Sequence, residues 1–527
     1  MKQSHLKLIR VGVSLLFLLC TSAVFMDLLG KLPAPLIDSI LYLQFIPSLI
    51  HYIQSAAWVS SGFIIILILT MLFGRLFCSC ICPLGALQDT FIRFFRHLTP
   101  YQRKFSYQQP LNLLRFGVLT ITMISSITGS LLLLSLLDPF SHFGRIMSDL
   151  IRPIVVAANN ILVMVFHWAG IYALYPLGYK APAALSLLLP LFILILLLCF
   201  TAERGRLFCN TFCPVGTLLS LLSHRSLFKI SINNSICTRC GKCALQCKAG
   251  CINLKESTVD FSRCISCFNC IRSCPEAAIR YNSSFKKRDA GNHPHKQQRR
   301  AVLTSLICFF LFRPHLGNSQ PPTPEAQKVP VRNRIPSTVV NEKNYPVAPP
   351  GARTINHLLS NCTACHLCIS TCPTGVLQPA LGKYGPNGFL RPHLDAVSGF
   401  CNFDCTRCGD ICPTGAIQRL PIKRKKRTQI GKTLFIKKNC VVETDKKDCG
   451  ACAEHCPTKA VRMVPFEGKL KIPELDNKYC VGCGACEHIC PVRPHKAIFV
   501  DGLPVHRISE APVSKPLTVV PMEDFPF

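Results

Sequence analysis

A cysteine spacing that recurs along the chain constrains its fold more than any other feature. Two runs, starting at Cys237 and Cys264, follow the pattern Cys-x2-Cys-x2-Cys-x3-Cys. Three such closely spaced thiolates wrap one face of an iron–sulfur cubane, while the fourth points away and binds the neighbouring cluster. Zinc sites typically use separated Cys-x2-4-Cys pairs instead. The spacing therefore predicts 4Fe-4S clusters rather than zinc or disulfides.

Four further runs, beginning at Cys362, Cys401, Cys440 and Cys480, bring the total to six and predict six clusters. Each cluster is expected to use three cysteines of its own run and the fourth cysteine of the neighbouring run. The six predicted ligand sets are Cys237, Cys240, Cys243 and Cys274; Cys264, Cys267, Cys270 and Cys247; Cys362, Cys365, Cys368 and Cys412; Cys401, Cys405, Cys408 and Cys372; Cys440, Cys449, Cys452 and Cys490; and Cys480, Cys483, Cys486 and Cys456.

Three places depart from the regular pattern. The run that starts at Cys401 is longer by one residue, and an inserted loop separates Cys440 from Cys449. Lys248 stands where proline usually follows the fourth cysteine, and Cys251 has no role in the ligand scheme. The inserted loop sets Cys440 apart from the other predicted ligands.

The first 200 residues are much more apolar than the rest, although the whole chain is 49% hydrophobic. A membrane-crossing helix takes about 20 predominantly apolar residues. Two weaker apolar segments, 35–52 and 154–175, are interrupted by polar residues, and we interpret them as amphipathic segments at the membrane interface. The four predicted spans are residues 11–29, 58–77, 113–137 and 183–200.

An internal repeat ends each half of this apolar region. The segment GRLFCSCICPLGAL at 74–87 recurs as GRLFCNTFCPVGTL at 205–218. Each half therefore reads as helix, amphipathic segment, helix and Cys-x3-Cys-Pro. Packing of the halves about a pseudo-twofold axis would bring together the four cysteines of these motifs, which predicts another cluster, two redox-active thiol pairs or inert structural cysteines. These four cysteines are Cys78, Cys82, Cys209 and Cys213.

Basic residues in the short loops predict the orientation of the spans. Lys2, Lys7 and Arg10 precede the first predicted span, and Arg93 and Arg96 follow the second, which places both of these ends in the cytoplasm. The net charge of +32 fits contact with anionic lipid or with an acidic redox partner. No nucleic-acid recognition motif accompanies it, so we expect no nucleic-acid partner.

The junction between the two cysteine-rich regions carries a basic segment at 286–318. Arg299 and Arg300 precede the short apolar stretch AVLTSLICFFLF, a pattern typical of export signals for folded, cofactor-loaded domains. The alternative is a basic loop before a buried helix. We expect this segment to remain as a fifth membrane anchor. The proline-rich residues 319–357 then predict a semi-rigid spacer.

These patterns predict a mixed fold class. We expect an all-α polytopic membrane domain of duplicated helix pairs, and α+β dicluster domains of the bacterial ferredoxin type. The expected domains are a membrane domain at 1–225, a cytoplasmic two-cluster domain at 226–285, the anchor at 286–318, the spacer at 319–357 and a four-cluster domain at 358–527, which we expect in the periplasm.

The residues also resemble a known pair of proteins. The membrane half with residues 237–275 resembles the NapH family of ferredoxin-type quinol dehydrogenase components, through its paired GRLFC-x3-CP motifs. The region from Arg299 onward resembles NapG, the exported partner, through its twin arginine and four cluster runs. The resemblance implies a multi-pass protein of the bacterial inner membrane that takes electrons from the quinone pool and passes them to a periplasmic reductase or cytochrome.

The resulting hypothesis is an electron-transfer oxidoreductase subunit with six 4Fe-4S clusters, or seven if the membrane cysteines bind one. Quinol oxidation needs a titratable group near its pocket. No catalytic residue in the usual sense is expected, since clusters carry the electrons. Two alternatives stay open: electron entry from a cytoplasmic ferredoxin, and a maturation or regulatory role. The titratable candidates on the predicted outer side are His51, His142, His167, Asp27 and Asp138.

Overall fold

The computed structural model of the 527-residue chain describes residues 5–27, 30–55, 61–98, 105–178, 184–283 and 339–510. The predicted anchor at 286–318 and the first part of the predicted spacer lie outside the described residues.

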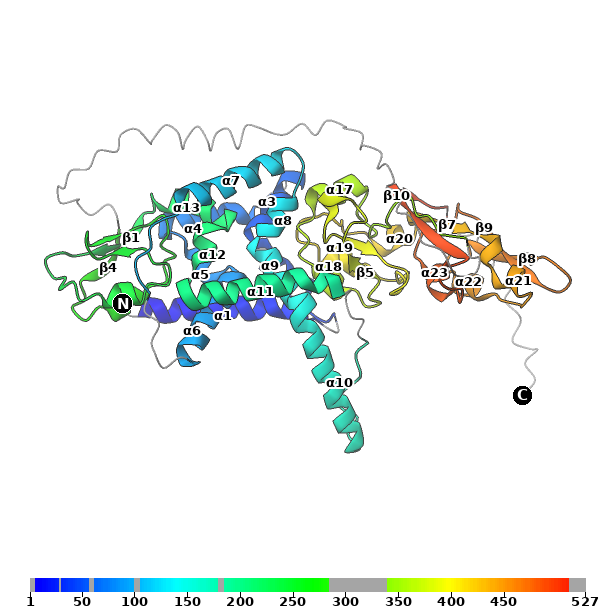
Figure 1. The fold of residues 1–527 in the computed structure, drawn as a ribbon, viewed down its shortest axis with the longest axis horizontal. Helices are drawn as coiled ribbons and strands as arrows, with labels where there is room; N and C mark the ends of the chain where they lie inside the picture. Colours follow the sequence, from blue (N-terminus) through cyan, green and yellow to red (C-terminus); the bar gives the residue numbers. More distant parts are fainter. Residues whose placement is uncertain are drawn as a thin grey trace, which may run out of the picture.

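The described residues between 5 and 223 form a helical half, which we call the membrane half (Figure 1). Its elements are α1 (His5–Met26), α2 (Ala34–Tyr42), α3 (Phe45–Ser55), α4 (Gly62–Phe73), α5 (Leu76–Cys80), α6 (Pro83–Leu98), α7 (Asn112–Ile127), α8 (Leu132–Leu137), α9 (Pro139–Arg145), the π-helix η2 (Ile146–Ile151), α10 (Arg152–Trp168), α11 (Ala184–Arg204), α12 (Leu207–Thr211) and α13 (Pro214–Ser223).

Three stretches of helix among the described residues are long and apolar enough to cross a membrane: α1, the continuous run Pro139–Trp168, and α11. The pair α2 and α3, bent by 99°, adds a fourth if it counts as one span. The predicted spans at 11–29 and 183–200 coincide with α1 and α11. These helices indicate a membrane protein.

The other predicted spans differ from the structure. Within 58–77 the described residues form the 12-residue α4 and then α5, and the stretch 113–137 is broken into α7 and α8 at Gly129, which has a φ of +88°. The segment 154–175, interpreted above as interfacial, lies largely in α10, which continues α9 and η2 into a span-length run. The pattern of duplicated helix pairs stays a prediction.

Two small α+β units carry the cysteine runs. The first cluster domain, 226–283, contains two antiparallel strand pairs, β1 with β4 and β2 with β3. Its elements are β1 (Phe228–Ile232), α14 (Lys242–Leu245), β2 (Ile252–Asn253), β3 (Thr258–Val259), α15 (Asn269–Ser273) and β4 (Ile279–Ser283).

The second cluster domain, 339–510, pairs β5 with β6, β8 with β9 and β7 with β10, all antiparallel. Its elements are α17 (Ile355–Asn361), α18 (Leu367–Thr371), β5 (Leu377–Pro379), η3 (Pro386–Gly388), β6 (Pro392–Leu394), α19 (Arg407–Asp410), α20 (Ile422–Lys425), β7 (Thr428–Phe435), η4 (Lys437–Asn439), α21 (Val441–Thr444), α22 (Ala451–Glu454), β8 (Val461–Pro465), β9 (Lys471–Leu475), α23 (Ala485–Ile489) and β10 (Ile498–Ile508).

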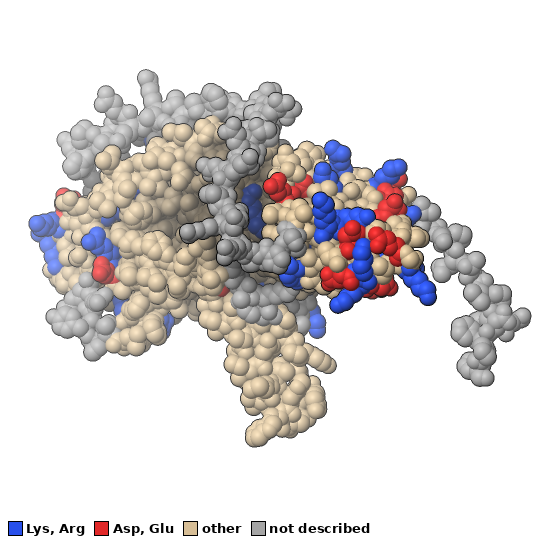
Figure 2. All heavy atoms as spheres, turned by 45° about the vertical axis from the view of Figure 1, so that its right-hand side comes forward, with Lys and Arg blue, Asp and Glu red and all other residues tan. Residues whose placement is uncertain are grey.

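The two cluster domains lie at opposite ends of α1 (Figure 1). Lys7, near the start of α1, interacts electrostatically with Cys267 of the first cluster domain. The other end of α1 contacts α18 of the second cluster domain. On the face shown in Figure 2, charged side chains gather over the cluster domains and leave an uncharged surface between them and on α10. This distribution suits a bilayer around the middle of the molecule.

Candidate iron–sulfur electron-transfer sites

Four of the six predicted ligand sets each line one hollow. In every case three cysteines come from one run and the fourth from its neighbour, and Cys440 joins its set despite the inserted loop. The sets are Cys237, Cys240, Cys243 and Cys274; Cys372, Cys401, Cys405 and Cys408; Cys440, Cys449, Cys452 and Cys490; and Cys456, Cys480, Cys483 and Cys486.

The other two predicted sets also come together. The thiol of Cys270 interacts with the thiols of Cys247, Cys264 and Cys267. Cys368 interacts in the same way with the other three members of its predicted set, and burial together with these thiols raises the pKa of Cys368 well above its usual value. Mutual repulsion of this kind is what a positively charged iron–sulfur core would offset. The three other members of the Cys368 set are Cys362, Cys365 and Cys412.

The cysteine sets surround space instead of meeting at a point. The empty space in the largest and smallest of the four hollows, open solvent at their mouths included, is ≈ 430 Å³ and ≈ 290 Å³. Across the described parts of the chain, no three His, Cys, Asp or Glu side chains are arranged to hold a single metal ion. Four thiols around a hollow fit a cubane, which presents four iron corners to four thiolates.

Left-handed residues between the cysteines shape the tight runs. In the run from Cys362, Ala364 has a φ of 52° and His366 a φ of 62°. The same two positions have positive φ in three other runs, and these turns let successive side chains point toward one centre. Sequence reasoning missed this feature, although glycine at two of the runs was a visible signal. The positions in the other runs are Arg239 and Gly241, Ser266 and Phe268, and Gly482 and Gly484.

Cys251, which the ligand scheme leaves without a role, lies beside a predicted cluster site. Its Sγ is 3.5 Å from the Sγ of Cys247, and its backbone N–H donates to the same sulfur. Cys251 is 2% exposed and also hydrogen-bonds to Cys264. The site formed with Cys264, Cys267 and Cys270 therefore holds five thiols.

The four cysteines of the repeat motifs, which we call the membrane quartet, also meet. The thiol of Cys82 interacts with those of Cys78 and Cys209, and the thiol of Cys213 interacts with all three. All four side chains are buried. The predicted packing of the two motifs is thus present in the structure.

Each motif places an arginine against the other motif. Arg75 donates to the carbonyl oxygen of Cys209 at 3.0 Å, and Arg206 donates to that of Cys78 at 2.8 Å. Glycines make this close packing feasible, since a Cβ on Gly85 would lie 2.3 Å from the Cys78 oxygen. The equivalent Cβ in the other motif would lie 2.2 Å from the Cys209 oxygen.

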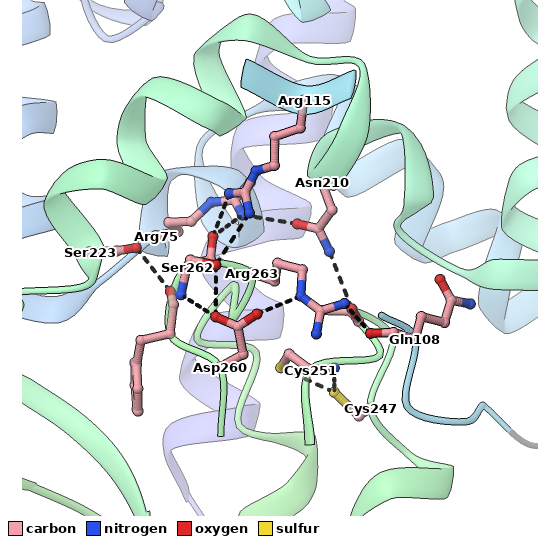
Figure 3. A network of polar contacts seen from close by, with 12 residues as sticks. Arg75, Gln108, Arg115, Asn210, Ser223, Cys247, Cys251, Asp260, Ser262 and Arg263 are labelled. Atoms are coloured by element: carbon pink, nitrogen blue, oxygen red, sulfur yellow. Dashed lines mark hydrogen bonds and ion pairs between the residues drawn. The ribbon is translucent and has the colours of Figure 1, made fainter. Parts of the chain in front are cut away.

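Polar contacts fix the membrane quartet to the first cluster domain. The N–H of Arg206 donates to the carbonyl of Lys248 at 2.9 Å, and the Asn210 amide donates to Ala249 at 3.3 Å. On the neighbouring side, Arg75 and Arg115 both donate to the carbonyl of Ser262, at 3.2 and 2.9 Å (Figure 3). The quartet and the cluster site that uses Cys247 are therefore held side by side.

The second cluster domain docks on the membrane half through α9 and η2. Arg145 is fully buried and donates through Nε to the carbonyl of Ala364 at 2.9 Å. The His366 ring bonds to the Asp149 carboxylate at 2.7 Å, and both side chains are buried. A Cβ on Gly144 would lie 2.3 Å from the carbonyl of Cys365. The predicted ligand Cys365 thus rests directly on the membrane half.

The five titratable candidates do not converge on one site. Asp138 caps α9, where its carboxylate accepts from Ser141, while Asp27 accepts from the backbone after α1. His167 packs on Tyr172 near the far end of α10. A fourth candidate, His51, is half-buried on α3.

His142 packs against one of the two motifs that carry the membrane quartet. It is 2% exposed, and its ring centroid lies 5.6 Å from that of Phe208, the residue before Cys209. Its Nδ1 has no hydrogen-bond partner among the described residues. His142 is one turn of α9 before Arg145, so it lies between the quartet and the docked second domain.

Comparison with known proteins identifies iron–sulfur binding in both halves of the chain. A model described as "4Fe-4S binding domain" matches residues 55–102, 185–233 and 408–430, and two models described as "4Fe-4S dicluster domain" match 361–417 and 447–493. The first model covers both halves of the membrane quartet. No solved structure matches the chain.

Similar curated proteins cover parts of the chain. An uncharacterized protein of Methanocaldococcus jannaschii is 25% identical over 43% of this chain and 79% of its own length. The ferredoxin-type protein NapH of Haemophilus influenzae is 24% identical over 45% of this chain and 71% of its own length. The ferredoxin-type protein NapF of Escherichia coli is 27% identical over 30% of this chain and 87% of its own length. Together with the cluster domains, these matches support a polyferredoxin similar to NapH.

Proposed function

We propose that this chain carries electrons across a membrane, from quinol oxidised in the membrane half to an acceptor that meets the second cluster domain. Iron–sulfur electron transfer is the part of this function that the family models and relatives share. Bound clusters would supply one-electron carriers, and the protein sets their positions and surroundings. The acceptor would be a periplasmic reductase or cytochrome.

The placement of the cluster domains at the two ends of α1 carries the proposal. The 22 residues of α1 rise about 33 Å at about 1.5 Å per residue. This length matches a hydrocarbon core of about 30 Å. Arg10, near the start of α1, pairs with Asp89, which also binds Lys248 of the first cluster domain. Phe25, near its end, packs on α9 beside the docking site of the second domain. A membrane around α1 would therefore have clusters on both faces.

The quinol step is assigned to the region of His142. A quinol gives up protons as well as electrons, so its oxidation needs a proton acceptor in a water-poor setting. The buried ring of His142 has an unpartnered Nδ1 that suits this role. His142 lies between the membrane quartet and Arg145, so a quinol oxidised beside it would release its electrons close to both cluster domains.

Single-turnover reduction tests this function. The full chain would be loaded with clusters anaerobically, placed in lipid nanodiscs and mixed with menaquinol, and cluster reduction would be followed by electron paramagnetic resonance. We expect reduction by quinol, slowed at least tenfold by His142→Gln and unchanged by His167→Gln, whose ring lies on the exposed part of α10. Clusters that menaquinol leaves oxidised but a reduced ferredoxin reduces would overturn the proposal and favour entry from a cytoplasmic ferredoxin.

A further inference from the structure

Four cations lie where the membrane quartet meets the first cluster domain, and three of them share one carboxylate. Asp89 pairs with Arg206 at 2.8 Å, with Lys248 at 3.2 Å, and with Arg10. The fourth cation, Arg75, is fully buried. Four cations less one carboxylate leave three positive charges in excess at this boundary. Arg10 and Lys248 also face the thiol of Cys267, whereas Arg75 and Arg206 face the thiol of Cys209 in the quartet.

Arg75 shows this imbalance most clearly. Its guanidinium donates to the side-chain oxygen of Asn210 at 2.9 Å and to the carbonyl of Ser262 (Figure 3). It also donates to the carbonyl of Cys209. All three acceptors are neutral. None of the ion pairs found within the described ranges includes Arg75. Within the motif of Arg75, the group that could carry the compensating negative charge is the sulfur of Cys78, 3.9 Å from Nη2 of Arg75.

Arg206, which occupies the position of Arg75 in the second motif, has the same relation to the quartet. A nitrogen of Arg206 lies 4.0 Å from the sulfur of Cys209, so each arginine faces the first cysteine of its own motif. A buried charge is costly unless an opposite charge lies nearby. Neutral thiols or disulfides would leave the excess positive charge uncompensated. Four thiolates around an iron–sulfur core carry more negative charge than the core neutralises, and so supply the missing anion.

We propose that Cys78, Cys82, Cys209 and Cys213 bind a seventh 4Fe-4S cluster, held by the two crossing arginines. The inference deepens the proposed electron-transfer function and rests on it for its role. The site lies beside the first cluster domain through Arg206 and Lys248, and beside α9 through Phe208. A cluster here joins the two groups of predicted clusters.

Cys80 provides a matched control for the ligand assignment. It is buried in α5 between the two quartet cysteines of its motif, and Thr211 occupies the equivalent position in the second motif. Its sulfur lies 3.7 Å from the hydroxyl of Ser79, and the groups that interact with it include Arg10 and Asp89. Cys80 is therefore a buried thiol in the same helix that is outside the quartet.

Iron and sulfide counting on the anaerobically purified full chain tests the proposal. The unmodified protein should contain about 28 rather than about 24 iron atoms, for seven rather than six clusters. The double variant Cys78→Ala/Cys209→Ala should lose about four iron and four sulfide, and Cys80→Ala should lose none. A count of about 24 in the unmodified protein overturns the inference even if the double variant fails to fold.

Failure of the seventh cluster and failure of quinol oxidation are distinguishable. Iron counting needs no electron donor, so a full iron count with no reduction by menaquinol would refute only the proposed function. A count for six clusters with rapid reduction by menaquinol would refute only the seventh cluster.

Discussion

The docking of the second cluster domain depends on one buried arginine. Arg145→Ala removes the hydrogen bonds that Nε donates to Ala364 at 2.9 Å and that Nη2 donates to Ser135 at 2.7 Å. A hydrogen bond from a charged donor contributes about 1.5–3 kcal/mol. The bond to Ala364 and a longer one from Nη2 to the carbonyl of Thr363, at 3.4 Å, cross between the membrane half and the second domain. Loss of the shorter bond alone should raise the population of the undocked state about ten- to a hundredfold.

Arg419→Ala removes the same charge from another contact between the same two parts of the chain. Arg419 pairs with Asp38, but the two side chains are 56% and 44% exposed. Exposed ion pairs contribute about 0–1 kcal/mol. The two variants therefore compare a buried arginine with an exposed one at the same interface.

Hydrogen–deuterium exchange of residues 362–369 in the full chain measures the docking directly. We expect exchange to accelerate about ten- to a hundredfold in Arg145→Ala and by less than about fivefold in Arg419→Ala. Equal exchange in both variants would contradict the assignment of Arg145 as the main docking contact.

Three further predictions concern the clusters and the stability of the fold. Cys274→Ala should abolish the cluster predicted at Cys237, Cys240 and Cys243, because the four cysteines line one hollow; spectra that lose only the Cys264 cluster would refute the crossed ligand scheme. Gly85→Ala should lower the melting temperature, because its Cβ would lie 2.3 Å from the carbonyl oxygen of Cys78. The control Gly117→Ala, whose Cβ would have nothing within 4 Å, should stabilise α7 by up to about 1 kcal/mol. Equal thermal shifts in the two variants would contradict the close approach at Gly85. Burial and the neighbouring Lys383 lower the pKa of His393 to about 4. The unfolded state therefore binds the proton more tightly, and the free energy of unfolding should fall as pH drops from about 6.5 to about 4. His393→Gln should reduce this loss of stability in denaturation curves measured against pH, and an unchanged loss would exclude His393 as its cause.

The sequence predicted the cysteine sets because iron–sulfur ligation ties spacing to local geometry. Cys274 follows Cys237 by more than 30 residues, yet both line one hollow, since antiparallel pairing of β1 with β4 brings the two runs together. The repeat likewise predicted that Cys78 and Cys209 would meet. Metal ligation leaves a periodic signature that survives without knowledge of tertiary packing.

The helix boundaries were harder to predict because hydropathy does not register local capping. Asn159 and Asn160 are among the polar residues that interrupt the apolar segment 154–175. They lie within α10 and donate to the carbonyls of Tyr175 and Leu177. These amides satisfy the backbone of the following segment and leave the helix continuous. An opposite error occurred at 113–137, where an apolar composition conceals the turn at Gly129.

The docking of the second cluster domain had no signal in the sequence. The Arg145 side chain and the carbonyl of Ala364 are separated by 219 residues, and carbonyl acceptors have no sequence signature. The predicted semi-rigid spacer implied a tethered domain and no fixed contact with the membrane half. The structure instead shows buried contacts, including the bond between His366 and Asp149. Tertiary packing, not a local sequence pattern, determines such contacts.

Electron passage across a sealed bilayer tests the central claim most directly. The cluster-loaded full chain would be reconstituted in liposomes that trap an oxidised, membrane-impermeant dye, with protease accessibility of the second cluster domain used to determine orientation. Dithionite would then be added outside in the absence of quinone. The account predicts that the trapped dye is reduced, and that Arg145→Ala slows its reduction while Arg419→Ala does not. Reduction of every cluster from outside with the trapped dye left oxidised would place both cluster domains on one face and contradict it.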